Sequence, residues 1–347
     1  MSVFPIDLKS DTVTKPSAAM RKIMSEAEVG DDVYGEDPTV ALLERTAAKL
    51  LGKEAALYVT SGTQGNLVSL LTHCVRGDGA LVGKDCHILN YEGGGLAVLG
   101  GIVPLQVDDA KSLPSIEALE LATPAKGNVH YAQAKLLCVE NTHNRGGGHA
   151  STPQEVALRV EWAHKNGLSV HMDGARLFNA TVALGVTPAE MTKGVDSVQI
   201  CLSKGLGAPM GSLICASRDF IDRARYWRKK VGGGLRQAGI VAAAGLYALE
   251  NNISRLKDDH DNAALIKDEL QKGGLRISEV ARPTNMVYFS AKSEAEADKL
   301  LAACRTREVI FNKTAPDTFR LATHLDVTRE QAETAATVIV EEYRKLG

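Results

Sequence analysis

The chain has 347 residues, of which 44% are hydrophobic and 24% are charged, a composition typical of a globular protein with a sizeable core. Its 40 Lys and Arg residues nearly balance 42 Asp and Glu residues, so no strong field would attract nucleic acid or anionic lipid. No apolar run reaches the roughly 20 residues that a membrane span requires, and the first residues do not resemble a secretory signal, so we expect a cytoplasmic protein. The six cysteines are scattered without a C-x-x-C pair, and we expect neither disulfides nor a zinc site.

From about residue 38 to 250, short β-rich apolar runs alternate with segments of helical periodicity. Asp37 and Pro38 are typical of a helix start, and Gly52 of a helix stop. A capping box begins at Thr152, ahead of a second helix. The predicted helices are 38–51 and 153–167, and the predicted strands are 55–59, 80–82, 168–172 and 197–202. This alternation favours an α/β fold with a mainly parallel sheet.

After about residue 250 the residue pattern changes, and charged segments of helical periodicity alternate with short predicted strands. The predicted helices are 254–272, 294–305 and 328–345, and the predicted strands lie near 287–289 and 319–322. We therefore expect a small α+β C-terminal domain. The predicted division of the chain is an N-terminal arm (1–20), a large domain (21–250) and the small domain (251–347).

Lys204 follows a predicted strand at the carboxyl edge of the sheet, where open α/β sheets place their ligands. Its amine could hold an aldehyde cofactor as an imine, and Gly205 and Gly207 would let the backbone turn beside it. Asp173 ends the preceding predicted strand, where a carboxylate could hold the protonated nitrogen of a pyridine ring. Alternatively, Lys204 merely ends its strand, and Asp173 caps a helix or pairs with Arg176.

Ser61-Gly62-Thr63 lies between a predicted strand and a segment of helical periodicity, so free backbone amides there could bind a phosphate. The same residues could also form a plain helix cap. No G-x-G-x-x-G after a strand, no P-loop and no G-x-S-x-G elbow occurs, which weakens dinucleotide, nucleoside triphosphate and serine-hydrolase interpretations.

Six motifs taken together resemble the low-specificity L-threonine aldolases: Ser10-Asp-Thr-Val-Thr14, Asp31-Asp-Val-Tyr-Gly-Glu-Asp-Pro38, Glu140-Asn-Thr-His143, Asp173-Gly-Ala-Arg176, Ser203-Lys-Gly-Leu-Gly207 and Gly232-Gly-Gly-Leu-Arg-Gln237. They occur in the family's order and span nearly the whole chain. The resemblance implies a pyridoxal 5'-phosphate (PLP) enzyme with the aspartate aminotransferase fold, fold type I. The implied reaction is cleavage of L-threonine or L-allo-threonine to glycine and acetaldehyde.

The resemblance also assigns cofactor contacts. Lys204 would carry PLP, Asp173 would pair with its ring nitrogen, and the phosphate would lie on Ser61, Gly62 and Thr63. His87, after the strand at 80–82, would lie in a loop and stack on the ring. Arg176 would lie near both the cofactor and the substrate carboxylate.

For the substrate, the resemblance implies that Ser10 and Arg320 bind the carboxylate and that His130 lies near the hydroxyl group. Tyr34 and Arg236 would reach a neighbouring subunit's site, Arg236 near the phosphate. Such sharing implies at least a dimer, and the family suggests a tetramer. The base that takes the hydroxyl proton stays open between His87, His130 and a water molecule.

Two departures from the family's commonest bacterial pattern are Leu235, where methionine is frequent, and the loop Asn144-Arg-Gly-Gly-Gly148, which leaves the threo or allo preference open. A rival hypothesis is a fold-related PLP enzyme, such as a β-eliminating lyase or an aminotransferase. A non-catalytic scaffold has less support because every chemical position is filled. No metal is expected, since His143, His149 and His171 show no ligand spacing.

Overall fold

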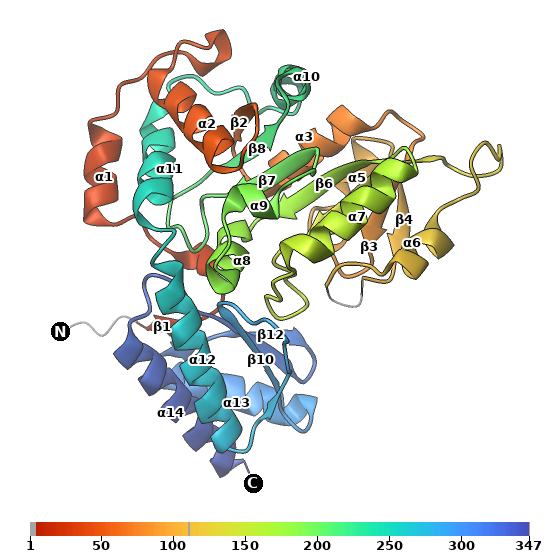
Figure 1. The fold of residues 1–347 in the computed structure, drawn as a ribbon. Coiled ribbons are helices and arrows are strands. Elements are labelled where there is room, and N and C mark those ends of the chain that lie inside the picture. Colours follow the sequence, from red (N-terminus) through yellow and green to blue (C-terminus); the bar gives the residue numbers. More distant parts are fainter. Residues whose placement is uncertain (1–4, 110–111, 347) are drawn as a thin grey trace.

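The computed structural model describes residues 5–109 and 112–346, so residues 1–4 of the predicted arm lie outside the described part. Figure 1 shows a larger unit built around a seven-stranded sheet and a smaller unit formed mainly by the C-terminal residues, in blue. In the described ranges, no helix is both long and apolar enough to cross a membrane.

The strands of the large sheet run in the order β2-β8-β7-β6-β5-β3-β4. All of them point the same way except β8, which is antiparallel to both β2 and β7. This arrangement confirms the mainly parallel sheet that the sequence predicts. The strands are β2 (Ala55–Val59), β3 (Gly79–Gly83), β4 (Val103–Val107), β5 (Ala134–Glu140), β6 (Ser169–Gly174), β7 (Ser197–Cys201) and β8 (Ser212–Ala216).

Successive side chains of these buried strands point to opposite faces of the sheet, and each face packs on its own helices. Tyr58, Met172 and Ile200 belong to the core of one face, which packs on α1 (Ala18–Ser25), α2 (Pro38–Leu50), α6 (Ile116–Ala122), α7 (Pro153–Lys165), α8 (Leu177–Leu184), α9 (Pro188–Met191) and α11 (Gly239–Asn251). Leu57 and Val82 point to the other face, covered by α3 (Gly62–His73), α4 (His87–Asn90), α5 (Gly95–Val98) and α10 (Arg218–Lys230).

The helix starts predicted at Pro38 and Pro153 are confirmed. Asp37 accepts the backbone N–H groups of Thr39 and Val40 at 3.1 and 2.9 Å, ahead of α2. Thr152 and Glu155 form the reciprocal capping box of α7. Satisfying these otherwise unpaired amides fixes where each helix begins.

The small unit has an antiparallel sheet in the order β12-β13-β10-β9, covered by three helices. Its elements are α12 (Leu256–Lys272), β9 (Arg276–Ile277), β10 (Met286–Ser290), α13 (Glu294–Thr306), β11 (Val309–Ile310), β12 (Asn312–Ala315), β13 (Thr318–Ala322) and α14 (Arg329–Lys345). The predicted α+β character of this region is confirmed.

The N-terminal segment joins the small unit. β1 (Ile6–Asp7) pairs with β11, and Leu8 is fully buried in the same hydrophobic core. The chain then passes through the short 3-10 helices η1 (Asp11–Val13) and η2 (Asp32–Tyr34) into the large unit. The exact domain boundaries remain a prediction, although Leu256 packs in the large core and Ala263 in the small one.

Candidate active site

A cavity of about 870 Å³ lies between the carboxyl ends of the parallel strands and the antiparallel sheet of the small unit. The large unit contributes His87, Arg176 and Lys204 to its walls, and the small unit contributes Tyr288 and Arg320. Ser10 joins them from the N-terminal segment. The cavity therefore brings together residues more than 300 positions apart, at the sheet edge predicted for a ligand.

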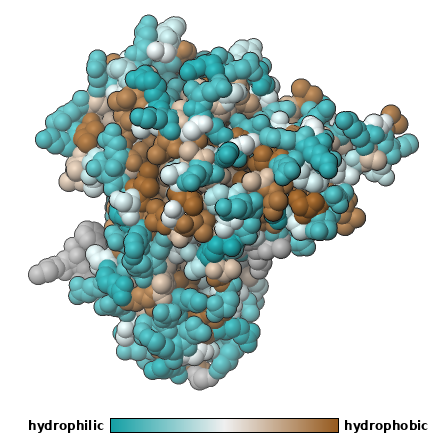
Figure 2. Space-filling model, viewed as in Figure 1, coloured by the Kyte–Doolittle hydropathy of each residue, from teal (hydrophilic) through white to brown (hydrophobic). Residues whose placement is uncertain are grey.

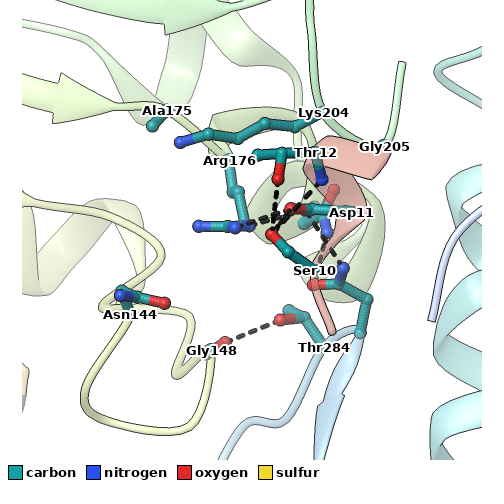
Figure 3. A network of polar contacts seen from close by, with 12 residues as sticks. Ser10, Asp11, Thr12, Asn144, Gly148, Ala175, Arg176, Lys204, Gly205 and Thr284 are labelled. Carbon is teal, nitrogen blue, oxygen red and sulfur yellow. Dashed lines mark hydrogen bonds and ion pairs between the residues drawn. The ribbon is translucent and has the colours of Figure 1, made fainter. Parts of the chain in front are cut away.

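Lys204 lies just beyond the end of β7, and Thr14 donates a hydrogen bond to its carbonyl oxygen at 3.0 Å. Figure 3 shows the side chain extended past Thr12 towards Ala175, with no contact drawn at its amine. Gly207, three residues later, adopts a positive φ of 78°, which a glycine accommodates without strain. Lys204 therefore does more than mark the end of the strand, because it also lines the cavity.

Asp173 lies at the end of β6, and the strand alternation turns it to the same face as α3. Its carboxylate is 2% exposed and accepts hydrogen bonds from the Ala175 backbone at 3.1 Å and from Asn66 Nδ2 at 3.0 Å. The two alternative roles considered for Asp173 are wrong. Arg176, not Asp173, precedes α8, and Arg176 pairs with a different carboxylate.

That carboxylate belongs to Asp11. Asp11 binds Arg176 through two parallel hydrogen bonds, from Nε at 2.6 Å and from Nη2 at 2.7 Å, and both side chains are buried (Figure 3). Burial alone would raise the pKa of Asp11, but the Arg176 charge outweighs it and holds that pKa well below the usual carboxyl range. The charge of Arg176 is therefore largely neutralised, and only Nη1 stays free of Asp11.

His87 begins the helical turn α4, not an irregular loop as expected from the sequence. Its backbone N–H donates to Glu140 Oε2 at 2.6 Å, and its Nδ1 lies 2.9 Å from Glu92 Oε1. Burial alone would lower the pKa of His87, but the Glu92 hydrogen bond and the nearby Asp173 outweigh burial and raise it. His87, Glu92 and Asp173 place one nitrogen or oxygen each within 4.8 Å of one another.

The N-terminus of α3 follows β2 and lies against the end of β7, three residues before Lys204, without lining the cavity. Ser61 caps this helix by accepting the Gln64 backbone N–H at 3.1 Å, so the cap interpretation is correct for its side chain. A Cβ atom on Gly62 would lie 2.8 Å from Cys201 Sγ in β7, so only glycine lets α3 approach the sheet this closely. The first backbone N–H groups of the helix, at Gly62 and Thr63, have no carbonyl partner within the helix and can donate hydrogen bonds to an anion.

Arg320 differs from Arg176 in its partners. It donates from Nη1 to the Asn144 side-chain oxygen and from Nη2 to the Lys9 carbonyl, both at 3.0 Å. Among the described residues, no carboxylate forms a salt bridge with Arg320. Tyr288, its neighbour across β10 and β13, donates to the Asn144 carbonyl at 3.0 Å. Arg320 is thus a cation in the wall of the cavity without a salt-bridge partner among the described residues, suited to bind a carboxylate.

Ser10 caps η1 and lines the cavity, where its oxygen accepts hydrogen bonds from Thr12. Of the other predicted residues, Asp173, Ser61, Gly62 and Thr63 do not line this cavity, and neither do His130, Tyr34 and Arg236. His130 is exposed in the turn that follows α6. Tyr34 is 73% exposed, and Arg236 stacks over its ring at 5.9 Å while pairing with Asp31 at 2.8 Å.

The sequence reasoning missed Asp11, Asn66, Glu92 and Glu140 as members of the site. Asp11 and Glu140 lie inside two of the motifs, and Asp11 is next to the predicted Ser10. Asn66 and Glu92 carry no such signal, because a polar residue one turn into a helix or in a loop is ordinarily solvated.

Chemically, the cavity wall offers the Lys204 amine and the His87 imidazole, and the buried Asp173 carboxylate and the N-terminus of α3 lie beside them at the edge of the sheet. A pyridine aldehyde bearing a phosphate needs this set: an imine partner, an acceptor for its ring N–H, an anion site and a flat contact. The residues present therefore fit such a cofactor.

Comparisons with known proteins agree with this chemistry. The model of the β-eliminating lyase family matches residues 7–292. The low specificity L-threonine aldolase of Escherichia coli K12 is 48% identical over 334 residues, which cover 95% of this chain and 97% of that protein. Low-specificity L-threonine aldolase 1 of Arabidopsis thaliana is 44% identical, over 93% of this chain and 92% of that protein.

Solved structures show the same fold at lower identity. The threonine aldolase of Leishmania major superposes with a TM-score of 0.83 at 20% identity, over 98% of this chain and 100% of that one. A putative L-allo-threonine aldolase from Listeria monocytogenes gives 0.80 at 22% identity, over 99% and 96%. A fold shared over the whole length, together with close relatives of nearly the same extent, leaves one conclusion: the chain belongs to the β-eliminating lyase family and, within it, to the low-specificity L-threonine aldolases.

Proposed function

We propose that this chain is a PLP-dependent aldehyde-lyase that cleaves the Cα–Cβ bond of L-threonine, L-allo-threonine or both, giving glycine and acetaldehyde. Close relatives bear the name of this activity, and this chain matches almost the whole length of each. The observation that carries the proposal is a single cavity that presents the Lys204 amine, the Arg320 cation and the His87 imidazole. Other L-β-hydroxy-α-amino acids would share the groups that these residues recognise.

The cofactor would be held by groups at or after the ends of β2, β6 and β7. Lys204 would bind its aldehyde, Asp173 would accept its ring N–H, and the amides of Gly62 and Thr63 would take its phosphate. When bound, PLP supplies an electron sink for the negative charge left by bond cleavage. Asn66 and the Ala175 amide fix the Asp173 carboxylate beforehand, so it need not reorganise.

The substrate carboxylate would bind Arg320, with Ser10 and the free Nη1 of Arg176 beside it. Arg320 is held by two neutral oxygen acceptors, which orient the guanidinium without neutralising it. A carboxylate held in this way fixes the orientation of the bonds at the substrate's Cα. This orientation decides which of those bonds breaks.

His87 would take the proton of the β-hydroxyl group as the Cα–Cβ bond breaks. It is the one predicted histidine that lines the cavity of its own chain, and an imidazole titrates close enough to neutral pH to act as a base. His130 could act only in another conformation or another copy, because its turn lies away from this cavity.

We further propose an oligomer, at least a dimer and by family resemblance a tetramer, in which Tyr34 and Arg236 enter a neighbour's site. Both are exposed and lie together, away from the cavity of their own chain. Exposed apolar residues on the contacting elements α1, α2 and α11 support an interface there: Ile23, Leu42 and Ile240. Figure 2 shows apolar residues interspersed over the large unit on this face, whereas the small unit is mainly hydrophilic.

The cytoplasm is the proposed compartment, supported by six cysteines that are all buried and unpaired.

The test is to incubate the purified protein and PLP with each threonine isomer and to follow acetaldehyde through alcohol dehydrogenase. Acetaldehyde and glycine in equal amounts would support the proposal, and the ratio of the two rates would give the preferred isomer. Formation of 2-oxobutanoate would indicate β-elimination, and a keto-acid-dependent exchange of the amino group would indicate an aminotransferase. Either of these without acetaldehyde would overturn the proposal.

A further inference from the structure

Glu92 lies beside the cavity on the segment between α4 and α5, and nothing in its sequence context marks it as functional. Its side chain is only 5% exposed. A single oxygen, Oε1, lies 2.9 Å from His87 Nδ1 and 2.7 Å from Asn66 Nδ2. Burial raises the pKa of Glu92, while these hydrogen bonds to His87 and Asn66 oppose that rise. A carboxylate buried here must have a partner that compensates it.

Asn66 can be oriented in only one way. Its nitrogen faces two carboxylates, Glu92 at 2.7 Å and Asp173 at 3.0 Å, and an ionised carboxylate only accepts hydrogen bonds. The Asn66 oxygen must then point to His171 Nε2, 3.0 Å away, and accept a hydrogen bond from its N–H group.

The direction of hydrogen-bond donation is also fixed among the buried groups that follow His171. Since His171 carries its proton on Nε2, its Nδ1 accepts from the Ser197 hydroxyl at 2.8 Å, and Ser197 in turn accepts from His73 Nε2 at 2.8 Å. Burial lowers the pKa of His171 to about 4 and that of His73 to about 3, so both stay neutral at physiological pH. This chain of fixed donors holds the Asn66 amide, and through it Glu92, in one arrangement.

We propose that Glu92 is a positioning residue that keeps the proton of neutral His87 on Nδ1, so that Nε2 is the unprotonated nitrogen available to the substrate. The inference rests on the proposed function, because it assigns the nitrogen that takes the hydroxyl proton. It follows from geometry: an acceptor-only oxygen at 2.9 Å requires a proton on Nδ1. Nε2 has no hydrogen-bond partner among the described residues, and the ring lines the cavity.

Other charged and titratable groups also face His87. Asp173 and Lys204 act on it with opposite signs, the Tyr91 ring lies 5.4 Å from its ring, and Glu140 accepts its backbone N–H. Because the Glu92 and Asp173 charges raise the pKa of His87, they set how far the pH must rise before Nε2 is a free base. Removing the Glu92 charge should therefore shift the acid side of the pH profile to lower pH.

Two substitutions separate the charge of Glu92 from its hydrogen bond. In Glu92→Gln, Oε1 can still accept from His87, because a reversed amide would place its NH₂ group against the Asn66 NH₂. This variant should keep the His87 proton on Nδ1 but lower its pKa. Glu92→Ala removes the acceptor, so the proton should move to Nε2. Glu333→Gln, the same change on the exposed surface of α14, is the matched control.

The primary measurement is nitrogen NMR of the full chain labelled with ¹⁵N in the histidine rings, both without cofactor and with PLP. It reports which ring nitrogen is protonated and the pH at which each ring titrates. His87→Gln assigns the signal among the nine histidines. The second measurement is kcat/KM for threonine cleavage against pH, which should fall by about 10²-fold in Glu92→Ala and shift to lower pH on its acid side in Glu92→Gln.

A parent protein with its His87 proton on Nε2, or an unchanged His87 tautomer in Glu92→Ala, would overturn the inference. So would a tautomer change in Glu92→Ala that leaves the pH profile of cleavage untouched. The NMR result does not depend on catalysis. A parent with the Nδ1 proton that nevertheless forms no acetaldehyde would therefore overturn the proposed function, while the tautomer assignment would be supported.

Discussion

Replacing Asp11 by Asn tests the buried ion pair that holds Arg176 beside the cavity. The variant keeps the size of the side chain but leaves the buried Arg176 charge without a counter-ion, a loss of about 3–5 kcal/mol for buried pairs. Two charge-assisted hydrogen bonds of about 1.5–3 kcal/mol each give a similar figure. With an unfolding entropy of about 2.1 cal/mol/K per residue over the whole chain, the melting temperature should fall by about 4–7 °C.

The pH dependence follows from the lowered pKa of Asp11. The stabilisation is fully present above the ordinary carboxyl value of about 3.9 and is lost only as the pH falls towards the lower folded value. Calorimetry at pH 7 and pH 5 should therefore give the same difference between parent and variant. Asp261→Asn is the control, since its pair with Lys257 is exposed and should contribute below about 1 kcal/mol. If Asp11→Asn melted within a degree of the parent, the role given to this pair would be refuted.

Three further predictions concern the cavity. Lys204→Ala should lose the visible absorbance of the lysine-bound cofactor and reduce kcat by about 10³-fold or more; a spectrum and the acetaldehyde assay check this, and full activity would contradict it. Arg320→Gln should raise KM for threonine by about 10–100-fold, the worth of a hydrogen bond to a charged group, whereas an unchanged KM would remove Arg320 from carboxylate binding. Gly62→Ala places a Cβ 2.8 Å from Cys201 Sγ, and the resulting strain of about 1–3 kcal/mol should weaken PLP binding by about 5- to 150-fold in a fluorescence titration. Gly95→Ala, whose Cβ would meet nothing closer than 3.7 Å, should bind PLP normally.

The fold was predictable where local signals agree with tertiary packing. The capping residues before α2 and α7 place the helix starts to the residue, and β2 spans the predicted 55–59 because an uninterrupted apolar run suits a strand buried on both faces. The place of Lys204 at a strand end followed from the same pattern. These features depend on a few neighbouring residues, which the sequence displays directly.

The polar partners could not be predicted, because each is supplied by a distant segment. Asp11 and Arg176 are 165 positions apart, and the motif that contains Arg176 gives no sign of which carboxylate it pairs with. The pairing of Asp173 with Arg176, three residues away, was the natural local guess, and it failed because the β6 alternation turns Asp173 towards α3 while Arg176 turns towards η1. His87 was placed in a loop because a single helical turn is too short to show periodicity.

The two arginines of the cavity show what the fold adds to the motifs. Both were assigned to the substrate carboxylate on the same grounds, and a guanidinium suits that task in either position. The fold gives Arg176 a buried carboxylate partner, whereas the described partners of Arg320 are neutral oxygens, so we propose that an incoming carboxylate would gain more from Arg320. We propose that Arg176 chiefly fastens the N-terminal segment, and with it Ser10 and Thr14, beside the strand end that precedes Lys204. The sequence marks both arginines as functional. Their partners in the fold favour a binding role for Arg320 and a positioning role for Arg176.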